Sequence, residues 1–197
     1  MNVTRLIMVA VGGQGNLLAS RILGQAATRS GVPVRMSEIH GMAQRGGVVE
    51  SDLVFGDAQS TIISDGEADI LLGFEPAESL RALKKCNKNT VVISNTSPLP
   101  PFTAAIGRGI YPEIETINSL LSAKCARLIA LDAAALAREA GNVLAANMVL
   151  LGALASADLL PLAPESLEEA IREITRQHFV DTNLKAFELG RQAGSAA

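Results

Sequence analysis

The sequence predicts an α/β fold: a Rossmann-like, mostly parallel sheet flanked by helices, with a helical C-terminal third. Short aliphatic runs alternate with segments of helical periodicity through most of the chain. Hydrophobic residues make up 48% of the sequence, yet it holds only five Phe, one Tyr and no Trp, which is typical of covered parallel strands. For a chain of 197 residues we expect one domain spanning positions 1–197.

The first unit passes from a strand through a glycine turn to a helix and a second strand. Residues 5–11 form a short aliphatic run that stops at glycines, which predicts a buried strand. Residues 16–31 have apolar positions at helical spacing and end at Gly31, a suitable C-terminal cap. Residues 32–38 are again strand-like, so the whole segment predicts a βαβ unit.

Further strands are expected at 46–57, 68–75, 90–95 and 126–133, where short apolar or alternating runs recur. A helix at 75–86 separates two of them. It begins with acidic residues and ends with basic ones, as the helix dipole favours.

The remaining periodic segments are helical. Two of them, 112–124 and 133–141, alternate with the later strands. A strongly apolar helix is then expected at 143–157, followed by amphipathic helices at 164–177 and 182–194.

Charge and composition exclude several classes of protein. Seventeen basic and twenty acidic residues give a net charge of −3, which argues against a nucleic-acid partner. The apolar stretch 143–162 is broken by polar residues and Pro161, so we expect no membrane span. Without a secretory signal, we expect a cytoplasmic protein whose Cys86 and Cys125 stay reduced. Two cysteines cannot hold a four-thiolate iron–sulfur cluster, and no metal site is expected on this chain.

The first candidate site is the turn Gly12, Gly13, Gln14, Gly15, with Asn16 after it. A glycine turn between a strand and a helix places free backbone N–H groups where a phosphate can bind. The match to the dinucleotide pattern GxGxxG is incomplete, because Leu18 stands at the third glycine position. A tight turn with no ligand is the alternative.

Glu38 supports a dinucleotide site. It lies at the end of the second strand, where dinucleotide-binding folds often place an acid for the ribose hydroxyls. It also leads directly into a loop that a simple NAD site does not need. An NAD-binding site therefore remains the second interpretation.

The loop EIHGMAQRGG, residues 38–47, is the second candidate site. His40, Gln44 and Arg45 follow the second strand, and open α/β sheets bind ligands at such strand ends. Arg45 offers a planar fork of donors for a carboxylate or phosphate, and Gly46 and Gly47 join the candidate cofactor-binding residues. We expect this loop and the glycine turn to face one crevice. A hairpin lead-in whose polar groups satisfy backbone atoms is the alternative.

Four other polar residues are weaker candidates for the site, and each also has a structural interpretation. Glu75 could point into the crevice or act as a carboxylate at a helix start. Asn142 and Asn147 could cap or form core hydrogen bonds, with a contribution to the cleft as the alternative. His178 is expected to be a helix-end residue.

Five stretches carry a family resemblance: VGGQGNLLASRILGQAA, SEIHGMAQRGG, GEADILLGFEPAESLRAL, GNVLAANMVLLGAL and NLKAFELG. In this order they resemble the small (beta) subunits of indolepyruvate ferredoxin oxidoreductases, which are gamma-type subunits of the 2-oxoacid:ferredoxin oxidoreductase family. The resemblance covers nearly the whole chain. The segment HGMAQRGG is its most specific part, because relatives acting on pyruvate or 2-ketoisovalerate tend to differ there.

The resemblance implies a reaction that this chain does not perform alone. The family converts a 2-oxo acid, here an arylpyruvate such as indolepyruvate, and coenzyme A to an acyl-CoA and CO2, and passes two electrons to ferredoxin. Thiamine diphosphate, Mg2+ and [4Fe-4S] clusters would sit on a large alpha partner subunit, so this chain would bind no cofactor by itself.

The resemblance also suggests roles for the two candidate sites. The turn from Gly12 to Asn16 would bind a phosphate of coenzyme A or form part of the subunit contact. His40, Gln44 and Arg45 would complete the site near the thiamine or the incoming coenzyme. Two other interpretations stay open: a free-standing NAD(P)-binding oxidoreductase and a structural subunit that binds no small molecule.

Overall fold

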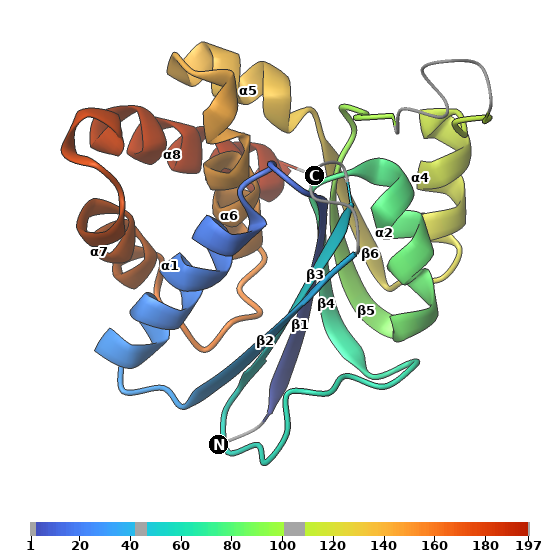
Figure 1. Ribbon diagram of the computed structural model, residues 1–197, viewed down its shortest axis with the longest axis horizontal. Coiled ribbons are helices and arrows are strands. Elements are labelled where there is room, and N and C mark those ends of the chain that lie inside the picture. The colour runs from blue at the N-terminus through green and yellow to red at the C-terminus, as the bar shows by residue number, and fades with distance from the viewer. Residues whose placement is uncertain (1–2, 42–46, 101–108, 197) are drawn as a thin grey trace.

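The computed structural model describes residues 3–41, 47–100 and 109–196 and has three layers, with helices on both faces of a sheet (Figure 1). In this described part the strands form one six-stranded sheet in the order β2-β3-β1-β4-β5-β6. The strands are β1 (Thr4–Val11), β2 (Val34–His40), β3 (Val48–Phe55), β4 (Ala68–Gly73), β5 (Cys86–Asn95) and β6 (Arg127–Leu131).

The sheet is mostly parallel, as predicted, but its first strands are arranged differently from the prediction. Strands β1, β4, β5 and β6 run parallel, whereas β3 lies antiparallel between β1 and β2. The two strands of the βαβ unit predicted for residues 5–38 are therefore not neighbours in the sheet, because β3 lies between them. Strand β3 follows β2 closely in sequence, so the two pair antiparallel and β3 takes the place beside β1.

Although β3 lies between them, β1 and β2 still run in the same direction, as a βαβ unit predicts. Because β3 is antiparallel to both of its neighbours, β2 runs in the same direction as β1. The carboxyl ends of β1 and β2, Val11 and His40, therefore lie at the same edge of the sheet.

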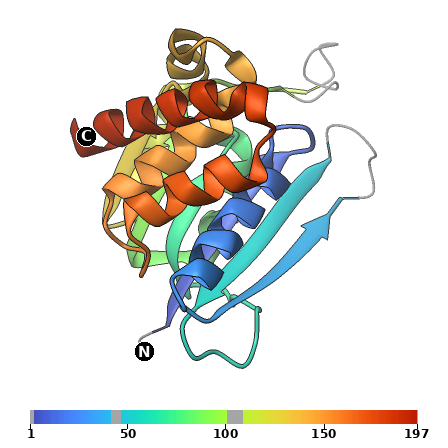
Figure 2. The ribbon, with the colours of Figure 1, turned by 90° about the vertical axis from the view of Figure 1, so that its left-hand side faces the viewer.

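One face of the sheet shares a core with five helices, which Figure 2 shows from the outside. Leu6, Met8 and Ala10 of β1 are fully buried on this side, as the twofold alternation of a strand requires. The helices are α1 (Asn16–Arg29), α5 (Ala133–Ala140), α6 (Ala146–Ser156), α7 (Pro164–Ile174) and α8 (Val180–Ala196).

The helical C-terminal third is confirmed, and α6 is the buried apolar helix that the sequence predicts. It packs against α8 with almost no space between the two backbones. A Cβ atom at Gly152 would lie 1.9 Å from the carbonyl oxygen of Phe187, so only glycine permits this approach.

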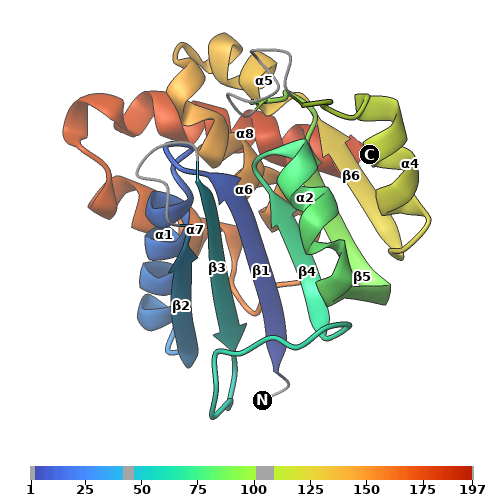
Figure 3. The ribbon, with the colours of Figure 1, turned by 45° about the vertical axis from the view of Figure 1, so that its right-hand side comes forward.

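The other face is covered by α2 (Pro76–Ala82) and α4 (Ile114–Ser122). Figure 3 shows α2 in front of β4 and β5, and α4 beside β6. Ile7 and Val9 of β1 belong there to a second apolar cluster, which also contains Ile117 and Leu121 of α4. The short 3₁₀ turns are η1 (Leu83–Lys85), η2 (Val143–Ala145) and η3 (Gln177–Phe179).

Candidate functional site

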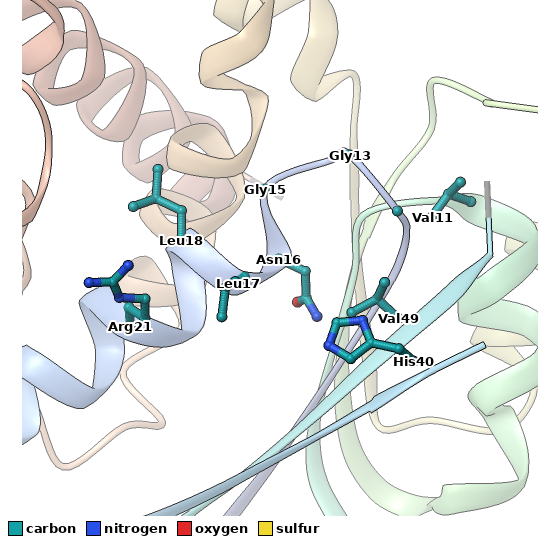
Figure 4. Close-up of a pocket in the computed structure, with 10 residues that line it drawn as sticks. Val11, Gly13, Gly15, Asn16, Leu17, Leu18, Arg21, His40 and Val49 are labelled. Carbon is teal, nitrogen blue, oxygen red and sulfur yellow. The ribbon is translucent and has the colours of Figure 1, made fainter. Parts of the chain in front are cut away.

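The ends of β1 and β2 line a common cavity of about 480 Å³ at the carboxyl edge of the sheet (Figure 4). Its volume falls within the range of small-molecule sites. The lining residues come from the strand ends, the glycine turn and the start of α1: Val11, Gly12, Gly13, Gly15, Asn16, Leu17, Leu18, Arg21, His40 and Val49. The structure thus brings the glycine turn and the end of the second strand to one cavity.

The glycine turn leaves the start of α1 open to a ligand. Gly13 and Gly15 have φ angles of 104° and 82°, a left-handed backbone that glycine adopts at little cost. Gly15 is the N-cap of α1, and no side-chain hydrogen bond caps this helix. The first N–H groups of α1 therefore remain available, and the helix dipole favours an anion beside them.

Two members of the turn serve mainly to hold it in place. The Gln14 side chain accepts from the N–H of Val11 at 2.8 Å and donates to the carbonyl oxygen of Phe74 at 3.1 Å. The N–H of Gly12 donates to the carbonyl oxygen of Gly47 at 2.8 Å. The Gln14 carboxamide and the Gly12 amide are thus engaged inside the protein, and the anion-binding capacity of the turn lies with Gly13, Gly15 and the first residues of α1.

Glu38 faces α1 and binds side chains of the protein. Its Oε1 accepts from Ser20 at 3.1 Å and from Ser51 at 3.3 Å, and its Oε2 lies 3.5 Å from Nε2 of His40. Ser51 in turn accepts from Nδ2 of Asn16 at 2.7 Å. The carboxylate that the sequence suggested for ribose hydroxyls is therefore the centre of a polar network that joins side chains of α1, β2 and β3.

Arg21 is a cavity residue that the sequence did not single out. It lies on the exposed side of α1, five positions after Asn16, and lines the cavity with its guanidinium on the outer side of the helix (Figure 4). No ion pair joins it to residues 3–41, 47–100 or 109–196. The one feature of the sequence that could have indicated Arg21 is a cation just after the first turn of a helix that begins at a glycine.

The candidates Gln44, Arg45 and Gly46 lie outside the described residues. Both flanks of their segment are placed, because the N–H of Gly41 donates to the carbonyl oxygen of Val48 at 2.8 Å and Gly47 binds Gly12. Of the two described flanks, Gly47 therefore lies beside the glycine turn.

Glu75 acts as the helix-start carboxylate that the sequence allowed. It is 1% exposed and caps α2, since its Oε2 accepts from the N–H of Glu78 at 3.0 Å. Its Oε1 accepts from the N–H of Leu99 at 3.2 Å and from the hydroxyl of Tyr111. Burial and this bond raise the pKa of Tyr111 above its ordinary value. Glu75 also lines another cavity, of about 500 Å³, beyond Gly12 and Gly47.

The asparagines have structural contacts. The Asn142 side chain accepts from the N–H of Leu144 at 3.0 Å, which confirms the capping role expected from the sequence. Asn147 is buried and donates to the carbonyl oxygen of Gly15 at 3.4 Å, which ties α6 to the glycine turn. His178 lies in η3, where its ring centroid is 4.0 Å from that of Phe179.

Metal ligands and membrane helices are not found in the described ranges. Residues 3–41, 47–100 and 109–196 contain no group of three or more His, Cys, Asp or Glu that could hold a metal ion. Cys86 and Cys125 are unpaired thiols, and burial raises the pKa of Cys86 to about 11. Across the same ranges, every helix is too short or too polar to cross a membrane.

Comparisons with known proteins cover almost the whole chain. The family model described as pyruvate ferredoxin/flavodoxin oxidoreductase matches residues 5–193. The chain is 44% identical over 185 residues to indolepyruvate oxidoreductase subunit IorB of Archaeoglobus fulgidus, covering 94% of this chain and 92% of the relative. It is 42% identical to the subunit of the same name from Methanothermobacter thermautotrophicus, covering 94% of both.

Solved structures share the fold. A keto/oxoacid ferredoxin oxidoreductase gamma subunit from Geobacter sulfurreducens matches with a TM-score of 0.71 and 23% identity, over 98% of this chain and 99% of that one. A 2-oxoglutarate:ferredoxin oxidoreductase chain from Magnetococcus marinus matches with a TM-score of 0.74 and 17% identity, over 100% of this chain and 32% of that one.

Proposed function

The chain belongs to the pyruvate ferredoxin/flavodoxin oxidoreductase family, and on this premise we propose that it is the small subunit of an indolepyruvate:ferredoxin oxidoreductase. The complex would convert an arylpyruvate and coenzyme A to an acyl-CoA and CO2, with two electrons passed to ferredoxin. The observation that carries this proposal is the identity of 44% and 42% to indolepyruvate oxidoreductase subunits over 94% of the chain.

We propose that this chain binds coenzyme A at the cavity beside the glycine turn. In our proposal the N–H groups of Gly13, Gly15 and the first turn of α1 bind a phosphate of the coenzyme. Arg21 lines the same cavity and contributes a cation to the same anionic group. It lies five residues after Asn16, which is about 7.5 Å along the helix axis at 1.5 Å per residue. The apolar walls, among them Leu17 and Val49, would exclude water around the rest of the molecule.

The carboxyl edge also supports contact with a larger partner. The exposed apolar side chains there surround the glycine turn and line the cavities that meet at it, as an interaction surface would. They are Leu17, Val48, Leu99, Ile110, Val143 and Leu144. We propose that the partner subunit covers this edge and that the segment with His40, Gln44, Arg45, Gly46 and Gly47 completes the active site from this side.

In this proposal the partner subunit carries the cofactors of the reaction. Thiamine diphosphate with Mg2+ would activate the 2-oxo acid there, and [4Fe-4S] clusters would take the electrons to ferredoxin. This chain would bind and orient coenzyme A beside that centre and close it from water.

The test is an anaerobic reconstitution. Co-purification from the host should yield a large brown partner, and indolepyruvate with coenzyme A should reduce ferredoxin or viologen when both chains are present. Within that complex, Arg45→Ala should raise a Michaelis constant or lower turnover without loss of assembly. Unchanged kinetics in an intact Arg45→Ala complex would remove the role assigned to that residue.

Other outcomes would point to the remaining interpretations. A colourless chain that co-purifies with no partner and binds NADH tightly would favour a free-standing NAD(P)-binding oxidoreductase. A complex whose activity tolerates every substitution in the cavity would leave a structural role for this chain.

A further inference from the structure

Asn16 is a buried polar residue at the cavity, and one of its atoms has no partner. It is the first residue of α1, is 4% exposed and lines the cavity. Figure 4 shows its carboxamide projecting from the helix into the space beside His40. Its Nδ2 donates to Ser51, whereas its Oδ1 has no hydrogen-bond partner among the described residues.

The neighbouring residues determine which atom of this carboxamide, Nδ2 or Oδ1, has no hydrogen-bond partner. A carboxylate accepts hydrogen bonds, so Ser51 donates its single hydroxyl hydrogen to Oε1 of Glu38 at 3.3 Å. Ser51 must then accept from Asn16, and it does so from Nδ2 at 2.7 Å. The hydrogen bonds from Asn16 to Ser51 and from Ser51 to Glu38 therefore leave Oδ1 of Asn16, an acceptor, without a partner beside the cavity.

A buried acceptor without a partner is costly, and a ligand that brings an N–H or O–H group would relieve that cost. A fully ionised phosphate cannot do so, because its oxygens only accept hydrogen bonds. The cavity walls around Asn16 are largely apolar and include Val11, Leu17, Leu18 and Val49. Of the parts of coenzyme A, the pantetheine arm combines aliphatic carbons with neutral amide N–H donors, so it is the part that matches these walls.

We propose that Oδ1 of Asn16 accepts a hydrogen bond from an amide N–H of the pantetheine arm of coenzyme A, and that Ser51 and Glu38 are its positioning residues. The inference rests on the proposed function and specifies which half of the coenzyme lies against α1. The oxygen is closed off from solvent, so the arm displaces a wall side chain as it binds. Leu17, which is 50% exposed, lines the cavity next to Asn16 and is the wall side chain that would move.

The test compares fragments of the coenzyme on the intact complex. Binding of coenzyme A, 4′-phosphopantetheine and adenosine 3′,5′-bisphosphate is measured by anaerobic calorimetry for the wild type and for Asn16→Leu, which keeps the shape of the side chain. The variant should bind the first two roughly three- to tenfold more weakly, the loss expected of one hydrogen bond. It should bind the bisphosphate with wild-type affinity. Steady-state assays should show a raised KM for coenzyme A at an unchanged kcat.

Two further variants keep the proposal falsifiable if Asn16→Leu folds poorly. Ser51→Ala retains Asn16 but removes the group that orients it, so it should show the same selectivity with a smaller loss. Asn118→Leu, a half-buried asparagine on α4, is the matched control and should change none of the three affinities.

Each contrary result has a distinct meaning. Equal weakening of all three ligands, or weakening of the bisphosphate alone, would overturn the assignment of the pantetheine half to Asn16. No change for any ligand in the folded Asn16→Leu complex would do the same. A wild-type complex that binds none of the three ligands would overturn the proposed function itself.

Discussion

Asn147 and Gly15 join the buried helix α6 to the turn at the start of α1. The Nδ2 atom of Asn147 donates to the carbonyl oxygen of Gly15 at 3.4 Å, across 132 positions of sequence. The contact depends on the missing side chain, because a Cβ atom at position 15 would lie 2.5 Å from that Nδ2 atom. The C-terminal helices therefore help to set the geometry of a turn made from the N-terminal residues.

Gly15→Ala should destabilise the protein through both strain and contact. The φ angle of 82° costs an alanine roughly 1–2 kcal/mol, and the new methyl group must push Asn147 aside. Urea unfolding should show a lower midpoint for Gly15→Ala. The double variant with Asn147→Ala should not lose the sum of the two single losses, since removing Asn147 relieves the contact. Strict additivity would show that the two residues are not coupled.

Arg21→Ala should weaken the binding of coenzyme A to the complex. We expect a loss of roughly two- to fivefold at low salt that shrinks as salt is added, because the guanidinium is exposed and its interaction is screened. Arg21→Lys should lose less, since it keeps the charge without the planar fork. Lys88→Ala is the matched control, because Lys88 is an exposed cation near the amino end of β5. An equal loss in Lys88→Ala would show that net charge, and not the position of Arg21, is responsible.

The sequence predicted the positions of helices and strands along the chain better than the order of the strands in the sheet. Residues 5–11 and the apolar segment at 143–157 have strong local patterns, and both elements are where the patterns place them. The insertion of β3 beside β1 was missed, because pairing between strands depends on contacts that a periodic pattern does not encode. The prediction that the glycine turn and His40 lie at the same edge of the sheet was still correct, since β1 and β2 run in the same direction.

The sequence predicted which segments line the candidate site, but not the hydrogen bonds among its side chains. The glycine turn and His40 do line one cavity. The contacts of Glu38 could not be foreseen, because Ser20 and Ser51 come from α1 and β3 and meet it only in the folded chain. Arg21 was overlooked because a cation on an exposed helix stripe has the same pattern as an ordinary solvated residue.

Asp52 should make the stability of the protein depend on pH. This carboxyl is 6% exposed, and burial, together with the nearby charge of Glu50, raises its pKa to about 6. The folded state therefore binds the proton more tightly than the unfolded state. The protein should be more stable below about pH 4 with respect to this group, and this contribution is lost as the pH rises through about 6.

Asp52→Asn tests this dependence, because it removes the titrating group and nearly keeps its shape. At pH 8 the variant should be more stable than the wild type by about 1–3 kcal/mol, at 1.36 kcal/mol per pKa unit, and at pH 4 the two should be nearly equal. Urea unfolding at both pH values measures the difference. An identical gain or loss at both pH values would show that Asp52 does not titrate in this range.

Tyr111 offers a direct spectroscopic check on the cap at Glu75. It is the single tyrosine of a chain without tryptophan, so the near-ultraviolet absorbance of phenolate reports on it alone. Burial and its hydrogen bond to Glu75 raise the pKa of Tyr111, so the isolated chain should form phenolate only above the usual value of about 10. Since the folded pKa is the higher one, this group stabilises the fold below pH 10 and the contribution is lost above it. Glu75→Gln should lower the pH at which phenolate appears, because the variant lacks the carboxylate that holds the hydroxyl proton. Phenolate that forms near pH 10 in a wild-type chain still folded by circular dichroism would contradict the contact between Tyr111 and Glu75.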